Sequence, residues 1–164
     1  MARGVEYVVA AQGPDGSWLG KWGVCFTYGT WFACEALAAS GDARAPKAID
    51  RACFFLASKQ NDDGGWGESA ESCVQKRYVR APSTVVQTAW AALTLALSRN
   101  ALFTPSLAKA CELLVRTQAA DGDWAVQEGM YGVFNQTCGV TYTAYRNVFP
   151  VWALARAAQR VKQP

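Results

Sequence analysis

Aromatic side chains are the most abundant residues of this sequence that could take part in chemistry. The 164 residues include seven Trp, six Tyr and seven Phe but no His, the commonest general base and metal ligand. The face of an aromatic ring attracts cations. Tyr142 and Tyr145 are three residues apart, so on a helix they would share one face. Pattern alone assigns these rings, like most others in the chain, to the hydrophobic core.

The positions of the carboxylates offer little acid–base chemistry. Five of them lie in glycine-rich turns, where turn and capping roles are expected: Asp15, Asp62, Asp63, Asp121 and Asp123. A general acid must be buried and kept neutral. The least polar setting belongs to Glu35, within an apolar segment, and we do not propose it as the acid. We therefore expect no general acid, no metal site and no cofactor in this chain.

The cysteines and the charges narrow the class of protein. Six Cys are widely separated with no CxxC pair, and no signal peptide is visible, so we expect reduced thiols in an intracellular protein: Cys25, Cys34, Cys53, Cys73, Cys111 and Cys138. The net charge of +3 comes without a basic run, which argues against a nucleic-acid surface. No stretch approaches the ~20 apolar residues of a membrane span.

Three similar stretches organise the chain. They are "QGPDGSW" (Gln12 to Trp18), "QNDDGGW" (Gln60 to Trp66) and "QAADGDW" (Gln118 to Trp124), which space Gln and Trp identically. The preceding residues also align, as in "RACFFLASKQ" and "KACELLVRTQ", with apolar positions at helical spacing. Each repeat therefore begins with an amphipathic helix that ends near its Gln, where the glycine-containing turn stops it.

A second, more apolar helix follows each turn. These helices are expected in "YGTWFACEALAASG", "STVVQTAWAALTLALSRN" and "YRNVFPVWALARAAQR", and they should be buried. We expect Ser83 or Thr84 to cap the second helix and Pro150 to start or kink the third. The aromatic residues embedded in these helices are expected in the core: Trp31, Trp90, Phe149 and Trp152. The fold class is all-α, an array or toroid of stacked α–α hairpins with amphipathic outer and apolar inner helices.

The shared Gln and Trp are expected to have a structural role. The Gln amide can bond backbone groups left unpaired at a helix end. The indole can pack beside it and shield those bonds from water. Each pair would then hold one hairpin to the next: Gln12 with Trp18, Gln60 with Trp66, and Gln118 with Trp124. We favour this role over a ligand site.

The same stretches resemble the QW motif of the triterpene cyclases. The ordered set resembles the C-terminal end of the oxidosqualene cyclases of the lanosterol and cycloartenol synthase group. The matching blocks are "WGVCFTYGTWF", "RACFFLASKQNDDGGWGES" and "GVFNQTCGVTYTAYRNVFPVWAL", and the resemblance covers nearly the whole chain. It implies an isomerase that cyclises (3S)-2,3-oxidosqualene to a sterol precursor through carbocations, without a cofactor.

The resemblance also implies that the chain is a fragment. Family members are several times longer and contain two α-helical barrels. Residues 1–164 would form the C-terminal part of the catalytic (α/α) barrel, with its upstream half and the second barrel absent. The family's general acid is the Asp of a DCTAE motif upstream of the matched region, and no "DCTAE" occurs here. The isolated chain is therefore expected to be inactive and, with an apolar face uncovered, to self-associate.

Five aromatic residues match positions that line the cyclisation cavity in that family. By motif they are Trp22 and Tyr28 in "WGVCFTYGTWF", Phe134 in "GVFN", and Tyr142 and Tyr145 in "TYTAYRN". The resemblance implies that these rings stabilise cations or shape the cavity, because a ring quadrupole attracts a cation and is a poor nucleophile. The residues themselves add only that Tyr142 and Tyr145 would share a helix face.

Two other classes of protein remain open. Prenyltransferase β subunits also form α–α toroids with Gly-Gly-Trp turns, but their zinc site uses Asp, Cys and His, and this chain has no His. A non-catalytic helical-repeat scaffold or lipid-binding fragment is the second alternative. For the full-length protein, the resemblance implies an oxidosqualene-type lipid substrate and contact with a membrane surface. It also implies a location at the endoplasmic reticulum membrane or a lipid droplet.

Overall fold

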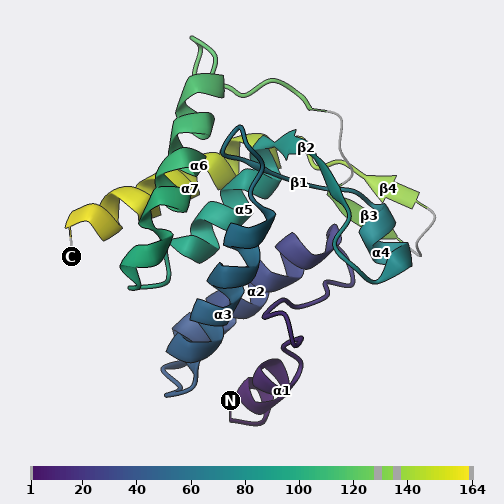
Figure 1. The fold of residues 1–164 in the computed structure, drawn as a ribbon. Coiled ribbons are helices and arrows are strands. Elements are labelled where there is room, and N and C mark those ends of the chain that lie inside the picture. The colour runs from purple at the N-terminus through teal and green to yellow at the C-terminus, as the bar shows by residue number, and fades with distance from the viewer. Residues whose placement is uncertain (1, 128–130, 135–137, 163–164) are drawn as a thin grey trace.

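Paired helices make up most of the chain. The computed structural model describes residues 2–127, 131–134 and 138–162, and the side chains of all of these except Phe134 and Lys162 (Figure 1). Three helices precede the glycine-containing turns: α1 (Ala2–Ala10), α3 (Ala45–Lys59) and α6 (Thr104–Thr117). Three helices follow them: α2 (Cys25–Ser40), α5 (Val85–Leu95) and α7 (Tyr145–Lys162). The prediction of stacked α–α hairpins is confirmed.

The outer helices α3 and α6 begin and end as their sequences predict. Each carries a proline in its first turn, where the missing N–H has no helical partner to lose. Gln60 caps the C-terminus of α3, and Gln118 caps that of α6. Their buried residues lie on one face, as in Leu107, Ala110 and Leu114 of α6, because the apolar positions recur at helical spacing.

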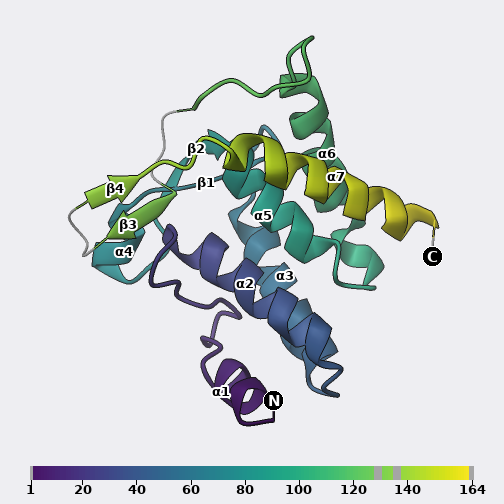
Figure 2. The same cartoon turned by 180° about the vertical axis from the view of Figure 1, so that it is seen from behind.

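The inner helix α5 forms the centre of the molecule. All eleven of its residues are buried, and it packs between α2 and α7, which Figure 2 shows on either side of it. Of the two residues expected to cap it, Thr84 does so. Its hydroxyl oxygen accepts a hydrogen bond from the Gln87 backbone N–H at 3.2 Å.

The last inner helix departs from its prediction in two ways. Pro150 does not start α7, which begins at Tyr145 and continues through the proline. The helix is also not buried all round, because one face carries the exposed side chains of Val148, Val151 and Trp152. An apolar helix is buried only where neighbouring helices cover it, and α5 and α6 cover one side of α7.

Short antiparallel strand pairs complete the fold. Strand β1 (Trp66–Glu68) pairs with β2 (Arg80–Thr84), and the short helix α4 (Glu71–Gln75) lies between them in sequence. Strand β3 (Gly132–Phe134) pairs with β4 (Cys138–Val140) just before α7. The 3₁₀ helix η1 (Ala101–Phe103) leads into α6. An isolated bridge between Gly23 and Gly132 holds β3 beside the segment that leads into α2.

The prediction that all six cysteines are reduced is wrong for two of them. Cys25, at the start of α2, and Cys73, in α4, form a disulfide with a Cα–Cα distance of 5.8 Å. They are 48 residues apart in sequence, so only the packing of α4 against α2 brings them together. Cys34, Cys53, Cys111 and Cys138 are free thiols.

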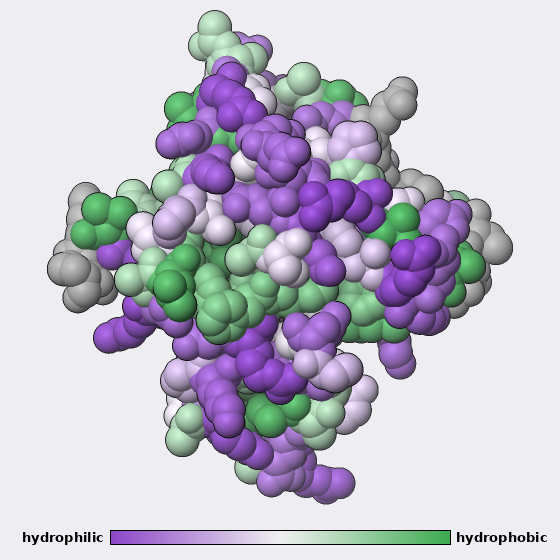
Figure 3. All heavy atoms as spheres, viewed as in Figure 1, coloured by the Kyte–Doolittle hydropathy of each residue, from purple (hydrophilic) through white to green (hydrophobic). Residues whose placement is uncertain are grey.

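The surface of the outer helices mixes polar and apolar residues. Figure 3 shows mostly hydrophilic residues on this face, with an interrupted hydrophobic band across its middle. Exposed side chains on these helices include Phe54 of α3, Leu102 of η1 and Val115 of α6. No helix among the described residues is long and apolar enough to cross a membrane.

Candidate functional site

The three inner helices bring aromatic rings together on one side of the molecule. We call the following set the aromatic cluster: Tyr28, Trp31 and Phe32 of α2; Trp90 of α5; Tyr145, Phe149 and Trp152 of α7; and Trp22, Tyr131 and Tyr142 from the connecting segments. Neighbouring rings in the cluster lie at centroid distances of 4.5–6.5 Å, the range in which aromatic pairs attract each other.

Three residues expected at the cavity are in direct contact. The Trp22 indole Nε1–H donates to the Tyr142 hydroxyl at 3.1 Å, across 120 residues of sequence. The Tyr142 and Tyr145 rings stack at 4.6 Å with an angle of 23° between their planes. The Trp22 carbonyl also accepts the Val133 N–H at 2.8 Å, so β3 fixes the backbone of this tryptophan.

Tyr28 belongs to the same group of rings. It lies one turn before Phe32 on α2, with the two centroids 4.7 Å apart, and its ring meets that of Trp90 edge to face at 5.4 Å. Phe134, the fifth expected residue, pairs with Cys138 through the backbone of β3 and β4. The orientation of its side chain lies outside the described part of the chain.

Trp90 is the residue that joins the rings of the three inner helices. It is fully buried, stacks on Trp31 at 6.0 Å, and meets Tyr28, Tyr145 and Phe149 edge to face. Among the described residues, its Nε1–H is the one buried side-chain nitrogen or oxygen without a hydrogen-bond partner. The sequence places Trp90 in the core, which is confirmed, but it does not reveal this central position.

The other core predictions are confirmed in part. Trp31 and Phe149 are buried, as expected, whereas Trp152 is 38% exposed. Phe32, which the sequence did not single out, is 50% exposed and lies 4.5 Å from Trp31. The spacing of the aromatic residues could have shown that they share a helix face, because residues three or four apart lie on one side of a helix. These residues are Tyr28 and Phe32 on α2, and Tyr145, Phe149 and Trp152 on α7.

Burial raises the pKa of three tyrosines in the aromatic cluster. Burial raises the pKa of Tyr28, and the nearby phenols of Tyr145 and Tyr142 raise it further. Burial, with a smaller contribution from Tyr142, raises the pKa of Tyr145. Burial also raises the pKa of Tyr131. Neutral phenols present rings that attract cations and carry no phenolate to act as a nucleophile.

The carboxylates near the cluster are occupied. Glu35 forms an ion pair with Arg156, whose Nη2 donates to Glu35 Oε2 at 3.1 Å, and it accepts the Trp31 indole N–H at 3.0 Å. The guanidinium carbon of Arg156 lies 5.1 Å from the centre of the Trp152 ring. Both carboxylate oxygens of Glu35 are thus engaged by side chains of α2 and α7.

Glu68 is a buried carboxylate that the sequence reasoning missed. It is 5% exposed and accepts the backbone N–H groups of Phe26 and Thr27 at 2.9 and 2.8 Å, and the Thr27 hydroxyl at 2.9 Å. These N–H groups belong to the first turn of α2, where a negative charge is stabilised. Glu68 therefore holds the start of α2, the helix that carries Tyr28.

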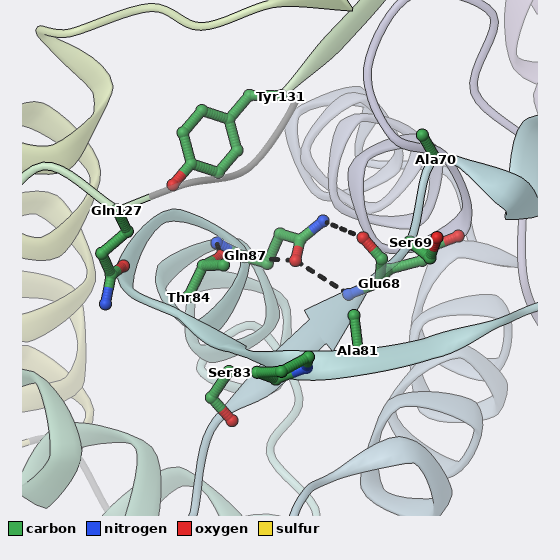
Figure 4. Close-up of a pocket in the computed structure, with 10 residues that line it drawn as sticks. Glu68, Ser69, Ala70, Ala81, Ser83, Thr84, Gln87, Gln127 and Tyr131 are labelled. Atoms are coloured by element: carbon green, nitrogen blue, oxygen red, sulfur yellow. Dashed lines mark hydrogen bonds between the residues drawn. The ribbon is translucent and has the colours of Figure 1, made fainter.

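A separate cavity of about 300 Å³ lies beside the cluster, and Tyr131 contributes to both. Figure 4 shows Gln87 pointing its amide at the backbone of Glu68, where it donates to the carbonyl at 3.0 Å and accepts the N–H at 2.8 Å. The Tyr131 hydroxyl points toward Thr84 and Gln127 in the same view. The amides of Gln87 and Gln127 are bonded to backbone groups, so they shape this cavity.

The described residues contain no group of His, Cys, Asp and Glu that could hold a metal ion. The aromatic cluster offers a different kind of chemistry. It can surround an apolar molecule with rings and stabilise positive charge on it.

Comparison with protein families gives one match over almost the whole chain. The model of the squalene-hopene cyclase C-terminal domain matches residues 1–159.

Individual proteins give the same result. The chain is similar to lanosterol synthase from Homo sapiens, with 45% identity over 97% of this chain and 22% of that protein. It is similar to cycloartenol synthase from Dictyostelium discoideum, with 48% identity over 97% of this chain and 22% of that protein. The chain thus spans about a fifth of the length of the curated relatives it matches.

Solved structures share the fold. A type II terpene cyclase from Scytonema, in complex with merosterolic acid A, has a TM-score of 0.70 and 19% identity, covering 98% of this chain and 48% of that one. At this level of identity the likeness concerns the fold alone.

Proposed function

Because this chain belongs to the squalene-hopene cyclase C-terminal domain family, we propose that it is the C-terminal part of the catalytic α/α barrel of an oxidosqualene cyclase. The whole protein would cyclise (3S)-2,3-oxidosqualene to lanosterol or cycloartenol. The observation that carries this proposal is the aromatic cluster, in which Trp22, Tyr28, Tyr142 and Tyr145 come together from distant parts of the chain. The high identity to lanosterol and cycloartenol synthases supports the choice of reaction.

In this proposal the chain supplies shape and electrostatics to the cyclisation. Positive charge that moves along a folded polyene is stabilised by each ring face it approaches, by about 0.5–2 kcal/mol. About 1.4 kcal/mol changes a rate tenfold, so several rings together direct where the charge comes to rest. The acid that opens the epoxide is assigned to the remainder of the protein. Among the described residues, the two carboxylates near the cluster are engaged elsewhere, since Glu35 is paired with Arg156 and Glu68 caps α2.

Each cavity residue except Phe134 is assigned a role from its position in the structure. Tyr142 and Tyr145 form a stacked wall, and the bond from Trp22 to Tyr142 fixes the orientation of both rings. Tyr28 continues this wall on α2. Phe134 is assigned to the same cavity by its motif alone. The Gln and Trp of the three turns are assigned a structural role, which at the first two turns includes a hydrogen bond to the next outer helix.

Self-association of the isolated chain is part of the proposal. One face of α7 exposes Val148, Val151 and Trp152, and a groove between α1 and α2 is lined by Val5, Val8 and other small or apolar residues. Surfaces of this kind are normally covered by other parts of a protein. The proposal also assigns the whole protein to the endoplasmic reticulum membrane or a lipid droplet, since its substrate would be a membrane lipid.

The direct test is to supply the full-length protein with 2,3-oxidosqualene or squalene and to identify the products by gas chromatography and mass spectrometry. The proposal predicts a tetracyclic alcohol from oxidosqualene and little conversion of squalene. A pentacyclic product from squalene alone would move the assignment to the squalene-hopene cyclases. No conversion of either compound by a folded protein would favour the non-catalytic scaffold.

A further inference from the structure

A groove lined by positively charged side chains lies outside the aromatic cluster. It has a volume of about 480 Å³, within the range of ligand sites, and lies between the first turn, the end of α3 and the segment that follows α4. Three cations line it together with three apolar or aromatic side chains: Lys59, Lys76, Arg77, Leu19, Phe26 and Tyr78. We call it the basic groove.

The position of Lys59 in the basic groove is fixed by two rings. Its Nζ lies 5.5 Å from the centre of the Phe55 ring and 5.7 Å from the centre of the Tyr78 ring. A lysine ammonium at this distance is attracted by both ring faces. The charge at the end of α3 is therefore held at the groove, where an unrestrained lysine on the surface would move freely in water.

Lys76 is held by the backbone. It caps α4 with a φ of 54°, and it is the only non-glycine residue with positive φ in the described part of the chain. Glycine or asparagine would adopt this conformation more easily, and other residues in such positions concentrate at functional sites. The strained backbone sets the direction in which Lys76 and the following Arg77 leave α4.

The positive charges of the groove have no carboxylate partner in the part of the chain that the structure describes. The ion pairs among the described residues involve other arginines, and none of them includes Lys59, Lys76 or Arg77. The only acidic residue lining the groove is Asp15, and its Oδ1 already accepts the Ser17 N–H and hydroxyl at 3.0 and 2.7 Å. The Tyr78 hydroxyl donates to the Gly67 carbonyl at 3.0 Å.

We propose that the basic groove binds the phosphate headgroup of an anionic phospholipid. The three cations would hold the phosphate, and the exposed Leu19 with the Phe26 and Tyr78 rings would contact the glycerol and the first part of an acyl chain. This combination of charge and apolar wall fits an amphiphile better than a free anion. The inference does not depend on the proposed cyclase function, because none of these residues belongs to the aromatic cluster.

The test measures binding of the full-length protein to phosphatidylcholine vesicles with and without phosphatidic acid. The variant is the triple substitution Lys59→Gln, Lys76→Gln and Arg77→Gln. The matched control removes the same charge elsewhere on the surface, with Arg3→Gln, Lys47→Gln and Arg99→Gln. We expect about fivefold weaker binding to the acidic vesicles for each groove cation removed, and a much smaller change in the control. Raised ionic strength should weaken the wild-type interaction.

A single variant separates binding from folding. Lys76→Gly removes one cation and relieves the positive φ, so the protein should become slightly more stable while vesicle binding weakens. Equal loss of binding in the triple variant and its control would overturn the proposal, since general charge would then explain it. A second result would also overturn the proposal: inorganic diphosphate binds at the groove, but the triple substitution leaves vesicle binding unchanged. The ligand of the groove would then be a free anion.

Discussion

The three glycine-containing turns have the same backbone conformation, but the first two contact a following outer helix and the third, within the described residues, does not. In each, the residue after Gln donates to the carbonyl four positions later at 2.8 Å, and the glycine that follows Asp adopts a φ near +90°. In each, the Trp indole donates to a carbonyl ten residues earlier, at 2.7–2.9 Å, in or near the last turns of the preceding helix. The local structure is therefore repeated three times.

The contacts with the next outer helix are found at the first two turns. Gln12 Nε2 donates to its own turn and to the Ala48 carbonyl of α3, and Gln60 Nε2 to its own turn and to the Ser106 carbonyl of α6. Gln118 Nε2 has a bond of 2.8 Å to the Gly122 carbonyl within its own turn, and no second acceptor among the described residues.

The glycines show the same difference. A Cβ added to Gly16 would lie 2.4 Å from the Arg51 carbonyl oxygen, and one added to Gly64 would lie 2.8 Å from that of Lys109. A Cβ on Gly122 would meet nothing nearer than the Gln118 amide at 4.0 Å. The motif thus carries two separate functions, a turn that it forms by itself and a contact that needs a following outer helix.

The largest expected effect comes from adding a methyl group to these glycines. Gly16→Ala should destabilise the 164-residue chain by about 3 kcal/mol, from positive φ and from overlap with the backbone of α3. Gly122→Ala should cost about 1 kcal/mol, from positive φ alone. Chemical denaturation of the two variants measures the difference.

Equal losses of unfolding free energy in Gly16→Ala and Gly122→Ala would contradict the difference between the first and third turns. In a longer protein in which a further outer helix covers the third turn, Gly122→Ala should cost as much as Gly16→Ala.

The tryptophans test what the turns have in common. Trp66→Phe and Trp124→Phe each remove a buried indole and its bond to a helix carbonyl, so both should cost about 2 kcal/mol. Trp90→Phe is the control, since its N–H has no partner to lose, and about 1 kcal/mol is expected from packing. A cost for Trp124→Phe far below that of Trp66→Phe would show that the shared bond also depends on the next hairpin.

The glutamines give a smaller effect. Gln60→Ala removes two hydrogen bonds, one of them to α6, and should cost about 1.5 kcal/mol, whereas Gln118→Ala should cost about half as much. Thermal unfolding of both variants is sufficient to rank them. The reverse order would mean that the bond to the next helix contributes nothing to stability.

The smallest effect concerns pH. At the third turn Arg146 of α7 binds Asp123, with Nη2 at 2.7 Å from Oδ2, and holds the pKa of Asp123 at about 2, below its ordinary value of 3.8. Because the pKa is lowered on folding, this pair stabilises the chain fully above pH 4, and its contribution is lost as the pH falls through about 2. At the first turn Arg51 binds neutral groups, the Gln12 amide oxygen and the Gly13 carbonyl.

Acid unfolding of Asp123→Asn and Arg51→Gln should therefore differ in form. The stability difference between Asp123→Asn and the wild type should disappear below pH 2, whereas that of Arg51→Gln should not follow the titration of a carboxylate. Parallel curves for the two variants would contradict the assignment of the ion pair.

The repeats, the helices and the turns could be predicted because each depends on local spacing and on residues that start or stop a helix. The disulfide between Cys25 and Cys73 and the cap that Glu68 provides for α2 could not, because both depend on the packing of distant segments. Exposure of Trp152 was missed for the same reason: composition indicates that a helix is apolar but not which of its faces is covered.

The candidate site depended on the resemblance more than on the pattern. The prediction that Tyr142 and Tyr145 share a helix face is wrong, because α7 begins only at Tyr145, and the two rings stack across the turn that precedes the helix. The contact of Trp22 with Tyr142 joins residues 120 positions apart. Trp90 and Tyr131 carried no signal that distinguished them from core residues. Their importance appears only when three inner helices are packed side by side.

The most direct test of the account is the product profile of the full-length protein carrying Tyr145→Leu, measured by gas chromatography and mass spectrometry after incubation with 2,3-oxidosqualene. Tyr7→Leu, on the exposed side of α1, is the matched control. If the aromatic cluster lines the cyclisation cavity, Tyr145→Leu should yield incompletely or differently cyclised alcohols, and Tyr7→Leu the wild-type product. A Tyr145→Leu protein that forms the wild-type product alone would contradict this account.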